Sequence, residues 1–193
     1  LNADVANTTI NGNGGADNLD VTGAIAGVTV NGGDGNDDID LTAAATGTTI
    51  NGGNGNDALD YAGAATTQDV DMGAGNDAVT LIASVTGDFD GGTGTDSITL
   101  AGASAATFSN FETVNVGTVT AADAGSFNGA GFVLNGTSVA FGAAGVAEIN
   151  VSTINVDAAG TFTWTSGLNG AVFGSSTGIT YTGSDTWDNT VTG

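Results

Sequence analysis

The chain of 193 residues carries 21 acidic residues and no Lys, Arg or His, so its formal net charge is −21 at neutral pH. A field of this sign repels nucleic acid and anionic lipid, and neither is expected as a partner. Apolar residues make up 40% of the chain, enough for a packed core, yet no run of them approaches the roughly 18 residues of a membrane helix, so no membrane insertion is expected.

The residue types favour an all-β protein with a hard cation as partner. Apolar residues occur in short runs separated by Gly, Asn and Thr, which is typical of strands joined by turns. All acidic residues except Glu112 and Glu148 are aspartates, whose short side chains suit tight turns and calcium-type sites. Cysteine is absent, so no disulfide contributes to the fold. The chain begins at Leu1 with no signal peptide, and we expect it to be a piece of a longer polypeptide.

Five copies of one acidic motif fill residues 11–100. They begin at Asn11, Asn31, Asn51, Asp71 and Asp90, so the spacings are 20, 20, 20 and 19 residues. One position holds an aspartate in every copy, and a glycine lies two residues before it. We call these aspartates the Asp column: Asp17, Asp37, Asp57, Asp77 and Asp96. Agreement at several positions through all copies indicates a repeat architecture.

Each copy predicts one coil of a stacked β-structure. Apolar residues lie two and four positions after each column aspartate, as Ile39 and Leu41 do after Asp37, which predicts a strand with one face inward. A second apolar stretch, around Val30, predicts another strand before the next acidic turn. Between the two strands lies a turn without the acidic motif. The expected fold of residues 1–107 is therefore a parallel β-solenoid with about 20 residues per coil and one acidic edge.

Stacking places the column aspartates about 4.8 Å apart. At this spacing two carboxylates repel by roughly 1 kcal/mol in water and by several times more near protein. The chain has no basic side chain to relieve this repulsion, so the sequence predicts a bound divalent cation. Ca²⁺ accepts about 6–8 oxygen ligands in flexible geometry, and glycine-rich turns expose the backbone carbonyls that it needs.

The motif resembles the RTX (repeat-in-toxin) calcium-binding nonapeptide G-G-x-G-x-D-x-U-x, where U is a large apolar residue. The similarity is closest in GGDGNDDID (32–40), GGNGNDALD (52–60) and GGTGTDSIT (91–99). The first copy departs from the pattern at Asn13 and Ala16, and the fourth departs at Met72. The resemblance implies a right-handed β-roll or β-helix with one Ca²⁺ between successive acidic turns, hence about four ions for five turns.

The same resemblance implies that the Asp column and the turn carbonyls hold these ions. The implied ligand glycines are Gly15, Gly33, Gly35, Gly53, Gly55, Gly73, Gly75, Gly92 and Gly94. Asp34, Asp71 and Asp90 are expected as additional ligands or as plain turn residues. Asn36, Asn56 and Asn76 are expected to form the turn. The usual RTX roll binds calcium along two edges, whereas the plain turn of each coil here predicts a single row of ions.

A second acidic column, Asp20, Asp40 and Asp60, is expected to point outward between the inward apolar residues. It is followed in register by Thr80 and Thr99. We favour a solvated ladder over the alternative, which is a second calcium site or a calcium-bridged contact with another molecule.

Residues 108–193 are expected to form a β-rich capping or assembly region. FSNFETVNV (108–116) resembles the stretch that closes calcium-binding rolls in RTX-bearing bacterial surface-layer (S-layer) proteins. Later apolar alternation, as at Phe162 and Trp164, fits either a continued parallel β-helix without calcium or a small β-sandwich. GSDTWDNTVTG (183–193) is similar to the opening of another acidic turn.

Few residue types in this chain suit catalysis. There is no His or Lys to act as a base, no Cys nucleophile, and no Arg or Lys to stabilise an oxyanion. Paired carboxylates could hydrolyse glycosides, but the clustered aspartates belong to the repeat, so no enzyme is expected.

The expected function is that of an extracellular structural protein at the bacterial cell surface. It would be stabilised by calcium and would assemble with itself into a surface layer, sheath or filament, with cell-surface polysaccharide as a further candidate partner. One alternative is a folded calcium-binding spacer or adhesin segment of a large type I-secreted RTX protein. An ice- or glycan-binding module would need a regular outward ladder, which the residues between the motif glycines do not form: Gly14, Asp34, Asn54, Ala74 and Thr93.

Overall fold

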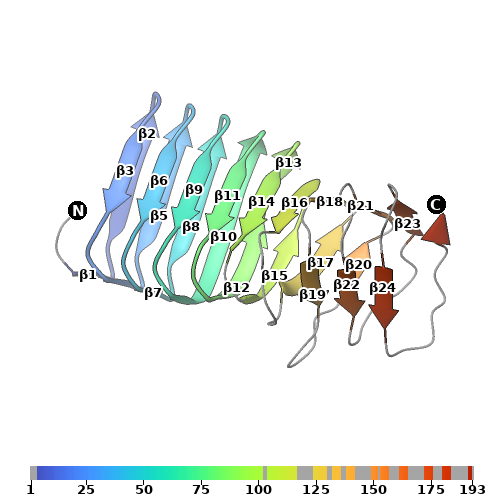
Figure 1. Ribbon diagram of the computed structural model, residues 1–193. Coiled ribbons are helices and arrows are strands. Elements are labelled where there is room, and N and C mark those ends of the chain that lie inside the picture. The colour runs from blue at the N-terminus through green and yellow to red at the C-terminus, as the bar shows by residue number, and fades with distance from the viewer. Residues whose placement is uncertain are drawn as a thin grey trace.

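The computed structural model is a stack of coils built from parallel strands (Figure 1). It describes residues 4–101 and 104–116, and beyond them the strands at 124–129, 132–135, 138–141, 149–151, 153–156, 161–164, 172–175, 180–183 and 191–192. Strands are the only regular secondary structure of these residues. Each strand pairs in parallel with its equivalent in the next coil, as Ile39 does with Leu59. The predicted parallel β-solenoid is confirmed.

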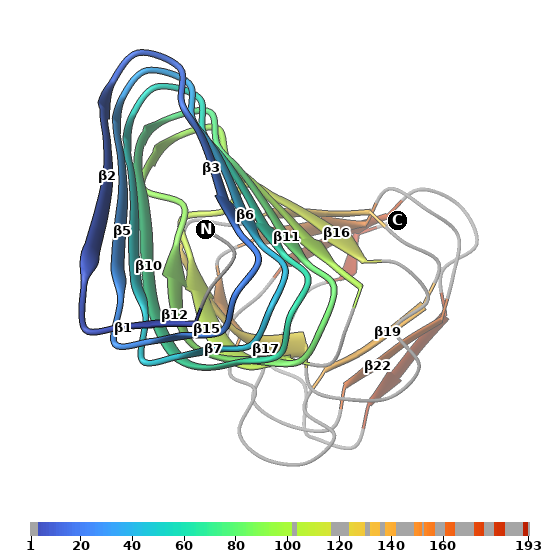
Figure 2. The same ribbon diagram turned by 90° about the vertical axis from the view of Figure 1, so that its left-hand side faces the viewer.

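One coil has three strands and a triangular outline when seen along the stack (Figure 2). In the second coil these strands are β4 (Ile25–Ala26), β5 (Thr29–Asp34) and β6 (Asp38–Leu41). Their equivalents before and after it are β1 (Val5–Ala6), β2 (Thr9–Gly14), β3 (Asn18–Val21), β7 (Ala45–Thr46), β8 (Thr49–Asn54) and β9 (Ala58–Tyr61). The fourth and fifth coils contain β10 (Ala65–Gly75), β11 (Ala78–Leu81), β12 (Val85–Asp90), β13 (Thr93–Gly94) and β14 (Ser97–Leu100).

Two features of the coil differ from the sequence prediction. The turn without the acidic motif contains a short strand, because each coil buries one apolar residue there: Ile25, Ala45, Ala65 and Val85. The long strand also runs through the first half of the acidic motif as far as Asp34, so the turn proper comprises only residues 35–37.

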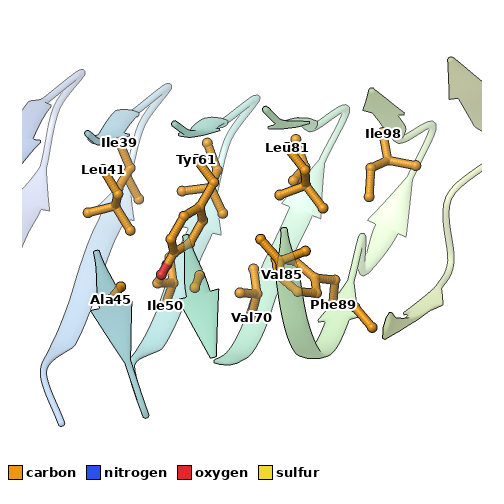
Figure 3. Packing of buried hydrophobic residues seen from close by; sticks show 14 of the residues in the cluster. Ile39, Leu41, Ala45, Ile50, Tyr61, Val70, Leu81, Val85, Phe89 and Ile98 are labelled. Carbon is orange, nitrogen blue, oxygen red and sulfur yellow. The ribbon is translucent and has the colours of Figure 1, made fainter. Parts of the chain in front are cut away.

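The core consists of inward residues that stack in files from coil to coil (Figure 3). Two files follow the acidic turns, and they contain Ile39, Leu59, Val79 and Ile98, and then Leu41, Tyr61, Leu81 and Leu100. Burying each large apolar side chain contributes roughly 1.5–3 kcal/mol. The core also holds a polar contact, in which the Tyr61 hydroxyl donates to Gln68 Oε1 at 2.7 Å.

The solenoid continues beyond the acidic repeats. The strands β15 (Ser104–Ser109) and β16 (Thr113–Val116) extend both long sheets past the predicted boundary at 107. Parallel pairing then runs through β17 (Ala124–Gly129), β18 (Phe132–Asn135), β20 (Ile149–Val151), β21 (Thr153–Val156), β23 (Val172–Ser175) and β25 (Val191–Thr192). A third parallel sheet contains β19 (Ser138–Phe141), β22 (Thr161–Trp164) and β24 (Thr180–Gly183). The strands beyond residue 107 therefore continue the parallel β-helix and do not form a β-sandwich. The division of the chain into two domains stays a prediction.

Part of the predicted C-terminal acidic turn, residues 184–190, lies outside the described residues. The part of the chain that the structure describes contains no helix long and apolar enough to cross a membrane.

Candidate metal centre

The acidic turns are stacked at the upper corner of the triangle in Figure 2, one behind another. Each turn joins a long strand, such as β5, to the strand that follows it, such as β6. All of the implied ligand glycines in these turns have a positive φ, between 90° and 151°. At Gly35, whose φ is 126°, an added Cβ would also collide with the carbonyl oxygen of Gly15 in the neighbouring coil. Only glycine combines this backbone conformation with so close an approach. The turn carbonyls therefore lie against the backbone of the next coil.

The Asp column lies on the inner side of these turns. Asp37 and Asp57 are 2% exposed and Asp77 and Asp96 are 1% exposed, although each is a carboxylate next to a surface turn. Alternation along the strand explains this burial, because a residue two positions before an inward apolar residue also faces inward. The first member, Asp17, is half-buried.

A ladder of hydrogen bonds joins the column aspartates from coil to coil. The backbone N–H of Asp37 donates to Oδ1 of Asp57 at 2.8 Å, and the N–H of Asp57 donates to Oδ1 of Asp77 at 2.7 Å. Asp17 and Asp77 donate in the same way to the aspartate of the coil that follows them. One carboxylate oxygen of each coil thus satisfies a backbone donor of the coil before it, which ties neighbouring turns together.

The ladder ends on Glu112, a residue outside the five acidic motifs. The N–H of Asp96 donates to Oε2 of Glu112 at 2.7 Å, so Glu112 takes the place of a column aspartate in the sixth coil. The sequence does carry a signal for it, since Val114 and Val116 follow Glu112 at the spacing that Ile39 and Leu41 keep from Asp37.

The second carboxylate oxygen of every column aspartate is buried without a partner. Among the described residues, no hydrogen bond reaches Oδ2 of Asp17, Asp37, Asp57, Asp77 or Asp96. A buried oxygen that carries part of a negative charge costs several kcal/mol when it is unpaired. A repeated orphan of this kind indicates a bound proton, an ordered water or a bound cation.

Backbone carbonyls converge on the same orphan oxygens. The motif glycine that faces the column aspartate across the turn has no side chain, and we call these residues the inward glycines: Gly12, Gly32, Gly52 and Gly91. A Cβ built on Gly32 would lie 2.5 Å from Asp37 Oδ2 and 2.6 Å from the carbonyl oxygen of Gly52 in the next coil. The carboxylate of one coil and the carbonyl of the next therefore line one cradle that a Cβ would fill, and both are oxygen ligands of the kind that Ca²⁺ prefers.

Burial acts directly on the charge of the column. Desolvation raises the pKa of Asp77 to about 6, and the charges of Asp96 and Asp57 add to the rise. Desolvation also raises the pKa of Asp57 and of Asp96, and the hydrogen bond that each accepts from a backbone N–H opposes the rise. Without a cation, the ionised forms of Asp57, Asp77 and Asp96 are therefore less favourable than those of exposed carboxylates.

We expect the metal-free protein to be more stable at pH 5 than at pH 7.5. The pKa of Asp77 is about 6 in the folded chain against an ordinary value of 3.8, so its contribution is present below about pH 4 and is lost as the pH rises through 6. The whole loss from Asp77 is at most about 3 kcal/mol in the free energy of unfolding, and a little under half of it, about 1.4 kcal/mol, falls between pH 5 and 7.5. Denaturant titration in chelator at several pH values measures it, and Asp77→Asn should remove this part of the pH dependence. Metal-free stability that rises steadily from pH 5 to 7.5 would contradict the expectation.

The structure separates the other predicted acidic ligands from the cradle. Asp34 is exposed and accepts a hydrogen bond from Asn54 Nδ2 at 2.8 Å. Asp71 and Asp90 lie in register on the outward face of β10 and β12, although Asp90 is near enough to contribute to the raised pKa of Asp96. These three residues are outside the group that the Asp column and inward glycines form.

The turn asparagines and the outer aspartates lie where the sequence analysis expects them. Oδ1 of Asn36 accepts the N–H of Asn56 at 2.8 Å, and the later turn asparagines repeat this contact. Asp20, Asp40 and Asp60 are in register on the strands that follow the acidic turns. Partial burial raises the pKa of Asp40, and the charges of neighbouring aspartates, Asp38 first among them, raise it further.

A cation at the cradle would take most of its ligands from the backbone. Nowhere in the described residues do three or more acidic side chains converge as a metal-binding group. Ca²⁺ accepts backbone carbonyls as well as carboxylates, so one or two column aspartates with several turn carbonyls suit it. Zinc sites are built mainly from His and Cys, which this chain lacks.

No protein-family model, curated protein or solved structure matches the chain. The resemblance to RTX repeats therefore depends on the motif residues alone.

Proposed function

We propose that this chain is a non-enzymatic structural protein whose coils are held together by Ca²⁺. The observation that carries the proposal is the stack of buried Asp Oδ2 atoms, each without a hydrogen-bond partner among the described residues, in a chain with no basic side chain. A cation between successive coils would neutralise these oxygens and link the column aspartate of one coil to a carbonyl of the next.

The proposed setting is extracellular, at a bacterial cell surface. Type I-secreted RTX proteins bind calcium outside the cell, and the motif of residues 11–100 resembles theirs. In this setting the solenoid would assemble with itself into a surface layer, sheath or filament, and cell-surface polysaccharide would be a further candidate partner. The outward strand faces carry Asp, Asn and Thr and no basic group, which suits a hydrated outer surface.

Self-assembly is supported by the way the sheets end. In the ten-stranded sheet, β3 and β25 are the terminal strands, and each pairs on one side only within the described residues. An unpaired strand edge favours addition of a further strand. A second copy would supply this strand in a lattice or filament. Further coils of a longer chain would supply it in the alternative function, a folded calcium-binding spacer or adhesin segment.

Sedimentation and electron microscopy in calcium distinguish the two functions. We expect ordered fibres or sheets in calcium that disperse in chelator. A monodisperse monomer in calcium would contradict self-assembly and favour the spacer. Equilibrium dialysis that finds no bound calcium would contradict both.

A further inference from the structure

One coil differs from the others at the cradle. The position of the inward glycines is occupied in the fourth coil by Met72, which is completely buried and belongs to the hydrophobic core. Its partner across the turn, Asp77, keeps its place in the ladder, since its Oδ1 accepts the N–H of Asp57 at 2.7 Å. The fourth turn therefore has the same hydrogen bonds as the third and a different interior.

The glycine geometry shows what a side chain does at this position. A Cβ on Gly52 would lie 2.7 Å from Asp57 Oδ2 and 2.5 Å from the carbonyl oxygen of Met72. A Cβ on Gly12 would likewise lie 2.8 Å from Asp17 Oδ2 and would collide with the carbonyl of Gly32. The space beside the orphan oxygens of Asp17, Asp37 and Asp57 is thus too small to hold both a side chain and an ion. At Gly91 an added Cβ would collide with the carbonyl oxygen of Asn110 and lie 2.9 Å from Cβ of Asp96, so a side chain is excluded there as well.

Met72 carries the Cβ that the inward glycines lack, followed by a thioether, at the repeat position that faces the column aspartate. Thioether sulfur is a soft ligand that suits Cu(I), whereas Ca²⁺ takes oxygen ligands. The side chain therefore removes the cradle of the fourth coil and offers the ion nothing in exchange, while it adds apolar burial to the core.

We propose that the row of calcium ions is interrupted at Met72. The cradles beside Gly12, Gly32, Gly52 and Gly91 each hold an ion, and the cradle beside Met72 holds none. This inference rests on the proposed calcium function. The fourth and fifth coils are then joined by hydrogen bonds and core packing alone, which makes their junction the one in the acidic stack that calcium does not reinforce.

Counting calcium bound to the full chain by equilibrium dialysis tests the inference. Met72→Gly should bind one ion more than the unchanged chain. Met72→Ala is the matched control, because it removes nearly the same core volume but keeps the Cβ, and it should gain no ion. A gain in Met72→Gly alone supports the inference, and an equal count in all three proteins overturns it.

A reverse substitution keeps the test valid where Met72→Gly fails to fold. Gly32→Ala should bind one ion fewer, because its Cβ would lie 2.5 Å from Asp37 Oδ2. Gly14→Ala is its control, since the nearest atoms lie 3.9 Å from its Cβ, and it should keep the full count. A full count in Gly32→Ala would overturn the inference, whereas an unchanged chain that binds no calcium would overturn the proposed function itself.

Discussion

Removing calcium is expected to leave residues 11–100 only partly folded, which far-UV circular dichroism would detect as a weaker β-sheet signal. A ligand at 100 times its Kd stabilises a folded protein by about 2.7 kcal/mol per site, so about four ions contribute roughly 11 kcal/mol. This is comparable with the entire stability of an ordinary domain, about 5–15 kcal/mol. The metal-free fold would also retain a row of buried carboxylates with no cation among its side chains. Calcium added back in excess should restore the signal.

Sodium chloride separates specific binding from general screening. At 1 M salt the Debye length is about 3 Å, so repulsion between exposed carboxylates is largely removed. Monovalent salt cannot bridge a buried carboxylate and a carbonyl, so we expect it not to restore the fold in chelator. A circular dichroism spectrum that excess chelator leaves unchanged would contradict the proposed role of calcium.

The solenoid could be predicted from the sequence because its information is local and repeated. Ile39 and Leu41 follow Asp37 at the period of a strand, and the return of this pattern every 20 residues requires equivalent residues to stack. The short third strand could not be predicted in this way. It buries one apolar residue per coil, such as Ile25, and a single residue has no alternation that would indicate a strand. Beyond residue 107, the alternation of apolar and polar residues is the same in a β-sandwich and in a β-helix. Only the strand pairing, which is parallel between successive coils here, distinguishes the two folds.

The identity of the Asp column could be predicted, but its environment could not. Asp37 lies two residues before Ile39, so strand alternation places both side chains on the inward face. A carboxylate, however, is rarely buried unless it is paired. The structure buries it because the backbone N–H of Asp17 donates to its Oδ1 and the inward glycine leaves room for the side chain. Glu112 could not be predicted from the motif because no glycine motif precedes it, and only its spacing to Val114 and Val116 indicates its place.

The substitution Asp57→Asn is expected to change stability in opposite directions with and without calcium. In the unchanged chain the N–H of Asp37 donates to Asp57 Oδ1 at 2.8 Å. Asn keeps an oxygen that can accept this hydrogen bond, but it replaces the charged Oδ2 with a neutral NH₂ group. In calcium the variant loses a charged ligand, and we expect it to be less stable by about 3 kcal/mol, the value of one site at 100 times Kd. In chelator it loses a buried charge, and we expect it to be more stable than the unchanged chain.

Asp60→Asn is the matched control because Asp60 is an exposed aspartate in the same coil, on the outward column. It removes the same formal charge from the chain, so it reports how much of any effect comes from the net charge alone. Exposed substitutions of this kind usually change the free energy of unfolding by less than about 0.5 kcal/mol. We expect Asp60→Asn to stay near this limit in both conditions, measured by denaturant titration with calcium and with chelator.

A third substitution, Asp57→Ala, separates the contributions of the two carboxylate oxygens to stability. It removes Oδ1 as well as Oδ2, so the N–H of Asp37 loses its acceptor, which costs about 1–3 kcal/mol whether or not calcium is present. Asp57→Ala should therefore be less stable than Asp57→Asn in both conditions. If instead Asp57→Asn destabilises the chain equally in calcium and in chelator, the carboxylate acts only as a hydrogen-bond acceptor within the turn, and no cation occupies its cradle.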